Sequence, residues 1–402
     1  MINLLHKRDC CGCHACMSIC PKSCISMRAD EEGFLYPFVD EQACINCGLC
    51  EKVCPVINQR EPRNPIEVYA AKCSDETIRR ESSSGGVFTA FAERVISDGG
   101  VVFGAKFDKE WRVIHAWTDT IEGLAQFRGS KYVQSCIGNT YKEVEQFLQQ
   151  GREVLFTGTP CQVAGLKKYL RKEYDNLTTI DVVCHGVPSP LVWQEYLKGL
   201  ECAKRTDGKN TVSSSLNDVS IIADISFRDK TMGWKKFGFK IGYVASKATE
   251  NSVSKSVVEY HIEPFYENLY MKGFLRNLYL RPSCYHCAAK SGRSGSDLTI
   301  ADFWGVERNH PELNDERGVS AMLVYNGEVE LGEKIEKTAV KYSEVLSSNT
   351  MIEQSVIEPH ERAEFWSEFP TRGVAVIAAI CRRMEPTFLA RVVSFVKRRL
   401  GL

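Results

Sequence analysis

Segments of two kinds, which differ in the spacing of their hydrophobic residues, alternate along most of the chain. Short runs rich in β-branched and aromatic residues predict strands, and longer runs with apolar residues every three or four positions predict helices. The helix predicted from Ser84 to Ile96, for example, places Val87, Phe91 and Val95 on one face. Strands and helices that alternate in this way predict an α/β (α+β) domain with a mixed sheet over residues 66–350.

Each predicted strand or helix follows one of these two hydrophobic periods. The strands are Val68–Lys72, Val101–Phe107, Val113–Trp117, Glu153–Phe156, Thr179–Val183, Ile221–Arg228, Phe237–Tyr243, Ser256–Ile262, Leu298–Ala301 and Ser320–Tyr325. The helices are Ser84–Ile96, Tyr141–Gln149, Gln162–Arg171, Leu191–Gly199 and a segment from Pro264 to about Phe274. Polar residues at 58–65 predict a linker, and those at 206–217 predict a mobile insertion.

Both ends of the chain depart from this pattern. Residues 1–60 carry short polar segments between cysteines and predict a separate small domain. Residues 351–402 predict a helical tail, which from Pro386 onward places a broad apolar stripe beside basic residues. We expect that helix to dock on its own domain or on a partner subunit. Weak contact with a membrane surface is the alternative.

Composition narrows the class of protein. The 402 residues include 51 Lys+Arg and 51 Asp+Glu, and a net charge of zero argues against nucleic-acid binding. The N-terminus lacks the apolar run of a secretory signal, and no apolar run approaches ~18 residues, so we expect a cytoplasmic protein. Ten of the 18 cysteines lie in the first 54 residues. In a reducing compartment, clustered thiols bind metal or take part in redox chemistry.

Those N-terminal cysteines contain two copies of the pattern C-x2-C-x2-C-x3-C-P. The first copy is Cys10, Cys13, Cys16 and Cys20, and the second is Cys44, Cys47, Cys50 and Cys54. This spacing is that of bacterial two-cluster ferredoxins, in which the fourth cysteine of each run binds the other cluster. We therefore predict one 4Fe–4S cluster on Cys10, Cys13, Cys16 and Cys54, and a second on Cys44, Cys47, Cys50 and Cys20.

A zinc module is the alternative interpretation of the same cysteines. Zinc takes four ligands, which leaves the third cysteine of each run and the repeated Cys-Pro ending without a purpose. The pattern therefore favours iron–sulfur clusters. Cys11 and Cys24 lie outside it and are expected to be bystanders.

Two turns in the large domain place small residues directly before a predicted helix. The turn of Ser83, Ser84, Gly85 and Gly86 would offer free backbone amides to a phosphate, although an ordinary serine N-cap is the alternative. Thr157, Gly158 and Thr159 repeat the arrangement without G-x-G-x-x-G, which excludes a Rossmann site. Ser130 and Lys131 add a possible partner for a pyrophosphate or a ring.

Four further cysteines lie near such turns or in a C-x2-C pair: Cys161, Cys184, Cys284 and Cys287. They predict a third cluster or a zinc site, and we favour iron–sulfur because the N-terminal clusters need an electron acceptor. Cys161 lies near a helix start, where a thiolate is stabilised. Buried free thiols are the alternative, and we expect that state for Cys73, Cys136, Cys202 and Cys381. Lys131 and Asp302 are candidate proton donors, and His185 and His286 are candidate ligands or proton donors, with a structural histidine as the alternative.

Several of these segments together resemble the family of beta subunits of coenzyme F420 hydrogenases and dehydrogenases. The matching stretches are SSSGG, RGSKYVQS, TGTPCQVAGL, VVCHGVPSP, SFRDK, RPSCYHC and DLTIADFWG. The resemblance implies a non-Rossmann flavin domain that binds FAD around the Ser-Gly-Gly turn, Lys131 and the Gly158 turn. It also implies that Cys161, Cys184, Cys284 and Cys287 hold a cluster. Bacterial members with this N-terminal unit are often linked to polysaccharide production.

The main hypothesis is thus an iron–sulfur flavoprotein oxidoreductase. Electrons from reduced ferredoxin or a partner subunit would pass through the clusters to FAD and on to a small organic acceptor, which nothing in the sequence identifies. One alternative is a non-catalytic electron-transfer subunit of a larger dehydrogenase complex. A zinc-bound interaction module is a third hypothesis. No catalytic residue is predicted.

Overall fold

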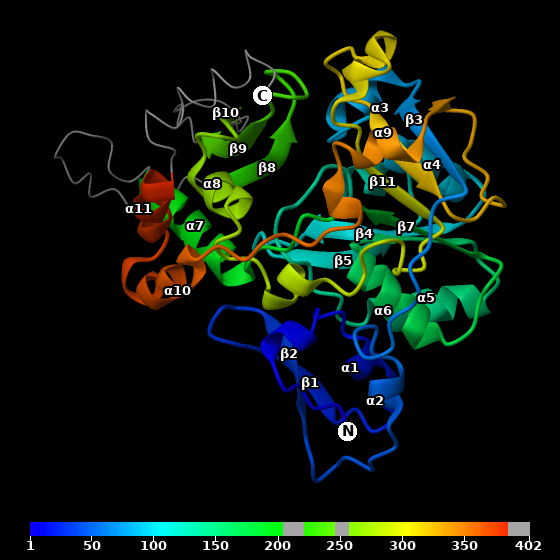
Figure 1. Cartoon of the computed structure of the whole chain (residues 1–402), viewed down its shortest axis with the longest axis vertical. Helices are drawn as coiled ribbons and strands as arrows, with labels where there is room; N and C mark the ends of the chain where they lie inside the picture. The colour runs from blue at the N-terminus through cyan, green and yellow to red at the C-terminus, as the bar shows by residue number, and fades with distance from the viewer. Residues whose placement is uncertain (204–220, 246–256, 385–402) are drawn as a thin grey trace, which may run out of the picture.

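The computed structural model describes residues 1–203, 221–245 and 257–384. The predicted insertion at 206–217 and the basic helix predicted from Pro386 lie outside these ranges. The described residues form an N-terminal unit, a large mixed sheet with helices on both faces, and a three-stranded sheet with its own helices (Figure 1). Among them, no helix is both long and apolar enough to cross a membrane.

The N-terminal unit (residues 1–58) is small and rich in cysteine. Its elements are η1 (Lys7–Asp9), α1 (Ala15–Ile19), β1 (Ile25–Ala29), β2 (Leu35–Val39) and α2 (Leu49–Lys52). Strands β1 and β2 pair antiparallel. The core of the unit joins cysteines to a few apolar side chains such as Ile2 and Ile25. So small a core depends on whatever the cysteines bind.

The large sheet has eight strands in the order β13-β3-β12-β11-β7-β6-β4-β5. Strands β4, β6, β7 and β11 run parallel to one another, and the remaining pairs are antiparallel. The strands are β3 (Glu67–Cys73), β4 (Val101–Phe107), β5 (Val113–Thr118), β6 (Val154–Gly158), β7 (Leu177–Val182), β11 (Leu298–Asp302), β12 (Ser320–Val324) and β13 (Ile335–Ala339). The predicted mixed sheet is confirmed. Strand β13 was not predicted, because Ile335 is its only buried residue.

Helices cover both faces of this sheet. They are α3 (Glu76–Glu81), α4 (Val87–Ser97), α5 (Thr140–Gln149) and α6 (Pro160–Leu170). Helix α4 packs against Leu155 and Ile180, whereas α5 and α6 pack against Val154 and Phe156. Because successive strand residues point to opposite faces, α4 lies on one face and α5 and α6 on the other. The N-terminal unit packs against α5 and α6 through α1.

The remaining strands form a separate antiparallel sheet in the order β10-β9-β8. It comprises β8 (Ile221–Asp229), β9 (Gly238–Ala245) and β10 (Val257–Pro264). Trp193, Phe227 and Tyr270 lie in the core that this sheet shares with α7 (Pro190–Ala203), α8 (Leu269–Leu275), α10 (Glu361–Arg372) and α11 (Ala375–Met384). The sequence predicted these strands but not that they leave the main sheet.

Short elements complete the chain. They are α9 (Tyr342–Leu346), η2 (Glu122–Gln126), η3 (Pro282–His286), η4 (Val306–Arg308), η5 (Pro311–Leu313) and η6 (Thr350–Ile352). The helix predicted from Pro264 is wrong at its start, because α8 begins only at Leu269. The Asn268 side chain caps it by accepting a hydrogen bond from the Met271 amide (3.0 Å). Helices α10 and α11 agree with the predicted helical tail up to residue 384.

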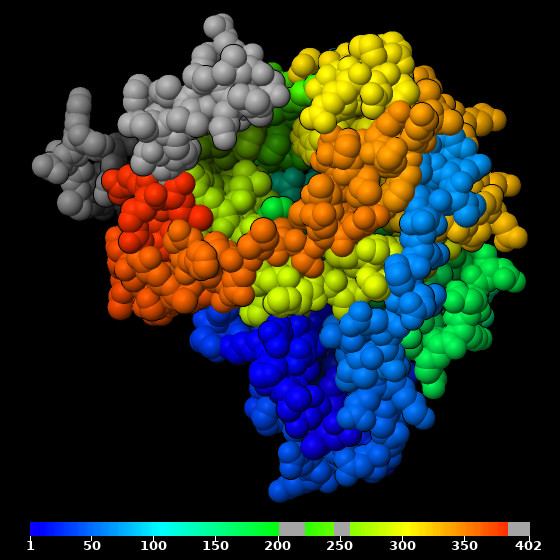
Figure 2. Space-filling model, viewed as in Figure 1, coloured from blue at the N-terminus to red at the C-terminus, as the bar shows by residue number. Residues whose placement is uncertain are grey.

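The parallel strands bring three loops to one edge of the large sheet. Strands β6, β7 and β11 end at Gly158, Val182 and Asp302. Ligands of such sheets bind outside the carboxyl ends of the parallel strands. The N-terminal unit lies below this part of the molecule, as Figure 2 shows in blue, against a yellow-green segment of the chain.

Candidate functional site

The cysteines of the N-terminal unit separate into two groups. Cys20, Cys44, Cys47 and Cys50 line one small cavity together with Cys24. In the other group, burial and the charges of Cys10 and Cys54 raise the pKa of the Cys16 thiol to about 12. Each run thus contributes its fourth cysteine to the other group, which is the arrangement that the ferredoxin pattern predicts. Cys24 was expected to be a bystander. Its sulfur atom lies 3.3 Å from the sulfur atom of Cys20.

The described thiols do not form a ready site for a single metal ion. Among the described residues, no three His, Cys, Asp or Glu side chains lie close enough together to hold one metal ion. A single tetrahedral zinc would need four such groups within about 2.3 Å of one point.

A second small cavity, of about 40 Å³, lies between the N-terminal unit and the large domain. Cys161, Cys184, Cys284 and Cys287 all line it, so the structure brings together the four predicted cysteines, which we call the quartet. Cys11, Pro55 and Val56 of the N-terminal unit line the same cavity. The sequence offered no sign that Cys11 faces the quartet.

Cys161 illustrates the environment of this cavity. It is the second residue of α6, directly after Pro160. A hydrogen bond with Cys11, together with burial, raises the pKa of the Cys161 thiol well above its usual value. In these surroundings the two effects outweigh the helix start, and the thiolate expected at Cys161 stays a prediction.

A larger cavity, of about 500 Å³, opens on the other side of the Cys184 loop. Cys184 and His185 line both cavities, so this loop separates them. The larger cavity is also lined by eight of the nine residues predicted to bind a cofactor: Ser83, Ser84, Gly86, Ser130, Lys131, Thr157, Gly158 and Thr159. A cavity of this size is typical of sites for small molecules and cofactors.

Gly85, the ninth predicted residue, does not line the cavity. Its amide is not free to bind a ligand, because it donates to Ser320 Oγ (3.0 Å). A Cβ at this position would lie 2.5 Å from the Ala71 carbonyl oxygen, so only glycine fits between β3 and β12. Gly85 therefore positions the turn instead of facing the cavity.

The start of α4 leaves its first amides uncapped. The N-cap is Gly86, in a left-handed conformation (φ 86°), and no side chain caps the helix. The alternative of an ordinary serine N-cap is therefore wrong. The free amides of an 11-residue helix, next to a cavity, suit a phosphate group.

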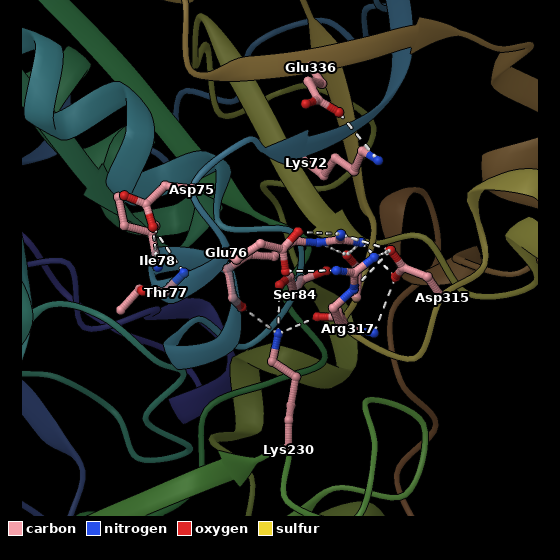
Figure 3. Close-up of polar contacts among 12 residues, drawn as sticks. Lys72, Asp75, Glu76, Thr77, Ile78, Ser84, Lys230, Asp315, Arg317 and Glu336 are labelled. Atoms are coloured by element: carbon pink, nitrogen blue, oxygen red, sulfur yellow. Dashed lines mark hydrogen bonds and ion pairs between the residues drawn. The ribbon is translucent and has the colours of Figure 1, made fainter.

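Lys230 fixes the turn before α4 from the three-stranded sheet. Figure 3 shows its ammonium pointing toward Ser84 and Arg317. Its Nζ donates to the carbonyl oxygens of Arg79 (2.8 Å), Ser84 (2.8 Å) and Arg317 (2.6 Å). Arg79 in turn forms a bidentate pair with Asp315 (2.8 and 2.7 Å). These contacts join the sheet of β8 to the cavity wall, a role that was not foreseen for the lysine of the SFRDK stretch.

A buried hydrogen-bond network supports the Gly158 turn. His115 is buried, and its Nε2 donates to the Thr157 carbonyl oxygen (3.0 Å). Its Nδ1 therefore accepts from Ser135 Oγ (2.8 Å), which in turn accepts from Gln162 Nε2 (2.8 Å). Burial lowers the pKa of His115 to about 4, so the ring is neutral. His115 was missed from the sequence, since a lone histidine in a strand carries no signal.

The candidate proton donors differ in their surroundings. Lys131 Nζ donates to the carbonyl oxygens of Arg128 (3.0 Å) and Gly129 (3.1 Å), and burial lowers its pKa to about 7. His185 Nε2 lies 2.6 Å from Asn277 Oδ1, and burial lowers the pKa of its imidazole. His286 lines the small cavity. Lys131 is thus a cavity residue that can give up its proton near neutral pH.

Asp302 lines the larger cavity but is not free to act as an acid. Both of its carboxylate oxygens accept from Arg228 (2.8 and 3.1 Å), and Trp234 Nε1 donates to Oδ1 (2.8 Å). Arg228 lies over the ring of Phe237, 4.1 Å from its centre. Its Nη2 donates to the Ser83 carbonyl oxygen (3.2 Å). The pair therefore fixes the cavity wall, and the expectation of an available Asp302 proton is not supported.

Comparison with known protein families agrees with this geometry. Residues 9–58 match the profile of a 4Fe-4S dicluster domain. Residues 68–140 and 151–348 match the N-terminal and C-terminal profiles of the coenzyme F420 hydrogenase/dehydrogenase beta subunit. The chain belongs to this family. The mixed α/β domain with an N-terminal ferredoxin-like 4Fe–4S unit is therefore confirmed, whereas flavin binding and the individual ligand roles stay predictions.

Curated relatives share parts of this beta-subunit chain. A coenzyme F420-dependent sulfite reductase of Methanocaldococcus jannaschii is 29% identical over 201 residues, which cover 49% of this chain and 31% of that protein. One of the subunits of the F420H2 dehydrogenase of Methanosarcina mazei is 24% identical over 165 residues, which cover 38% of this chain and 46% of that one. The chain thus spans less than half of the length of either relative.

One solved structure was also found to be similar to this beta-subunit chain. It is a chain of the F420-reducing [NiFe] hydrogenase complex from Methanosarcina barkeri, with 16% identity and a TM-score of 0.40. The match covers 71% of this chain and 90% of the other. A likeness of this degree is too weak to establish a shared assembly.

Proposed function

We propose that the chain is an iron–sulfur flavoprotein that transfers electrons between its N-terminal clusters and an acceptor, through a flavin bound in the large cavity. The observation that carries this proposal is the order of the sites in space: the N-terminal cysteines, then the quartet, then the large cavity. Cys11 lies at the boundary between the N-terminal unit and the quartet, and Cys184 lies at the boundary between the quartet and the large cavity. Iron–sulfur clusters pass single electrons, and a flavin converts them to two-electron chemistry.

The residues of the large cavity fit FAD. The uncapped start of α4 would bind phosphate through backbone amides, with Lys131 nearby as a cation whose hydrogen bonds go to backbone carbonyl oxygens. Apolar residues such as Val113, Ile180 and Ile300 form part of the wall, as a planar ring requires. Gly158 lets the turn pack on the wall of the cavity, because a Cβ there would already lie 3.1 Å from Gln162 Oε1.

An adjoining cavity would admit the acceptor. This cavity, of about 830 Å³, shares Arg128, Gly129, Ser130, Lys131 and Arg228 with the large cavity. The shared wall places Lys131 at the boundary, where it would hold or release a proton near neutral pH. The nature of the acceptor, and whether coenzyme F420 is one, stay open in this proposal.

Anaerobic purification of the full chain tests the proposal. We expect about twelve iron per chain and bound FAD, since three four-iron clusters are proposed. Gly158→Leu should abolish FAD binding and leave the iron content unchanged, because the added side chain would displace Gln162 and His115, which line the same cavity. Gly199→Leu is the matched control, since a Cβ there meets only Val374 at 3.8 Å. If the purified chain neither contains FAD nor binds added FAD, the flavin proposal is contradicted.

A second candidate function is that of a non-catalytic electron-transfer subunit. The observation in its favour is that a relative is named a dehydrogenase subunit, and that the chain spans less than half of it. Turnover distinguishes the two candidates. The purified chain with dithionite-reduced clusters would then reduce artificial dyes but not F420 or any other small acceptor. Neither curated relative described above is named for polysaccharide production, and that expectation stays a prediction.

A further inference from the structure

A buried arginine lies between the N-terminal unit and the quartet. Arg281 directly precedes η3, which carries Cys284, and its side chain is completely buried (0% exposed). It lines the small cavity together with Cys161 and Cys284. The guanidinium therefore belongs to the large domain by sequence but reaches the first cysteine loop.

The contacts of this guanidinium fix it on that loop. Nε donates to the Cys10 carbonyl oxygen (2.7 Å), and Nη2 lies 3.6 Å from Cys10 Sγ. Nη2 also donates to the Leu35 carbonyl oxygen (2.9 Å), and Nη1 donates to Gln134 Oε1 (2.9 Å). The centre of the Tyr36 ring lies 4.3 Å from Cζ. Every nitrogen of the group thus has a partner, and two partners are atoms of Cys10.

The loop is shaped around this side chain. Gly12 has a left-handed conformation (φ 68°), and a Cβ there would lie 2.7 Å from Arg281 Nη1. Gln134 donates from Nε2 to the Cys11 carbonyl oxygen (3.1 Å) while it accepts from Arg281. The glycine and the glutamine therefore keep the cation against the peptide groups that precede Cys13.

Among the described residues, Arg281 differs from the other buried arginines because no carboxylate pairs with it. Arg79, Arg228 and Arg362 pair with Asp315, Asp302 and Glu32. Across residues 1–203, 221–245 and 257–384, no carboxylate forms an ion pair with Arg281. Burial lowers its pKa, but the charges of Cys10, Tyr36, Cys11 and Cys284 raise it by more. A buried cation without compensation is costly, and the thiolates of the neighbouring cysteines can supply the compensating negative charge.

We propose that Arg281 is a positioned cation shared by the cluster of Cys10, Cys13, Cys16 and Cys54 and by the group that the quartet holds, and that it raises the reduction potential of both. Reduction adds negative charge to a cluster, so a nearby cation stabilises the reduced form, and more strongly where water is excluded. The part that concerns the quartet rests on the proposed function; the part that concerns the N-terminal cluster does not.

The second N-terminal cluster provides an internal reference. None of the hydrogen-bond or ring contacts of Arg281 falls on a residue that lines the cavity of Cys20, Cys44, Cys47 and Cys50. Its potential should therefore be insensitive to Arg281. A change confined to the cluster next to Cys10 would identify a local electrostatic effect.

The test is a redox titration of the anaerobically purified full chain, followed by electron paramagnetic resonance. Arg281→Met and Arg281→Gln remove the charge, and Arg281→Lys keeps it. Arg362→Met is the matched control: this buried arginine also joins the N-terminal unit to the rest of the chain, through Glu32 (Nη1 to Oε1, 3.0 Å). Cys47→Ala, which should lose the second cluster, assigns the remaining signal to the first.

We expect both neutral variants to lower the potential of the first cluster and to leave the second unchanged. Arg281→Lys should stay close to the wild type, and Arg362→Met should change neither. If the neutral variants lose the first cluster while Arg281→Lys retains it, the result still supports the role of the charge. An unchanged first cluster, an equal shift of both clusters, or the same loss in Arg281→Lys would overturn the proposal. Missing flavin or a total of eight iron would refute only the proposed function.

Discussion

The cysteines of the N-terminal unit and those of the quartet reach their sites in opposite ways. In the N-terminal unit two short runs bring the cysteines together, and Cys16, Cys50 and Cys54 themselves form much of the core. The quartet is assembled by α6, the loop after β7, and η3, which are far apart in sequence. A well-packed apolar core already holds those elements. Loss of iron should therefore unfold the first region and leave the second folded.

The largest expected effect is on the N-terminal unit. The double substitution Cys16→Ala and Cys50→Ala should abolish both N-terminal clusters and unfold residues 1–58, because so few apolar side chains remain to hold them. Hydrogen exchange should then show loss of protection in β1 and β2, while β4, β6 and β7 stay protected. Protection of β1 and β2 without the clusters would mean that the unit folds on its own.

The second prediction concerns the quartet. Cys284→Ala should remove about four iron per chain. The melting temperature of the large domain should fall by no more than a few degrees, because the truncation of one buried thiol costs about 1 kcal/mol. Iron analysis and calorimetry measure the two effects. A collapse of the large domain would show that the quartet, like the N-terminal unit, folds around its metal.

The third prediction uses pH to test the network beside the large cavity. The pKa of His115 is lowered by burial to about 4 from 6.5. Between those values the unfolded chain takes up a proton that the folded chain does not, so stability falls as the pH falls. The loss is at most about 1.4 kcal/mol per pH unit.

His115→Gln removes this titration and serves as the comparison. Urea unfolding of the two proteins at pH 7, 6 and 5 should show a difference in stability that shrinks toward acid pH. FAD affinity of the folded wild type should stay constant over this range, because His115 remains neutral and keeps donating to the carbonyl oxygen of Thr157 in the cavity wall. Parallel curves for the two proteins would exclude His115 as the titrating group.

The smallest effect is expected at a cysteine outside both groups. Cys136→Ser should leave the iron content unchanged, because Cys136 lines none of the cavities described above. Cys24→Ser is the sharper test, since Cys24 lies beside Cys20. We expect two intact N-terminal clusters there as well. Loss of iron in Cys24→Ser would mean that this cysteine is a ligand rather than a bystander.

The sequence predicted what local spacing determines. The two cysteine runs, the turn before α4 and the Gly158 turn were all recognisable, because their chemistry lies within a few residues. It did not reveal that Cys11 faces the quartet or that Arg228 pairs with Asp302, since those contacts depend on tertiary packing. The separate sheet of β8, β9 and β10 was missed for the same reason: a strand's pattern does not specify its neighbour.

The ion pair of Arg362 with Glu32 joins residues that are 330 positions apart. A ribosome makes the N-terminal unit before the large domain, and α10 leaves the exit tunnel only after both have been made. The contact of Glu32 must therefore wait for α10, and iron can be inserted while the cysteines are still accessible. Once α10 arrives, Glu32 is buried and the unit closes against the large domain. Cluster insertion thus has a time window set by translation, and slower translation would lengthen it.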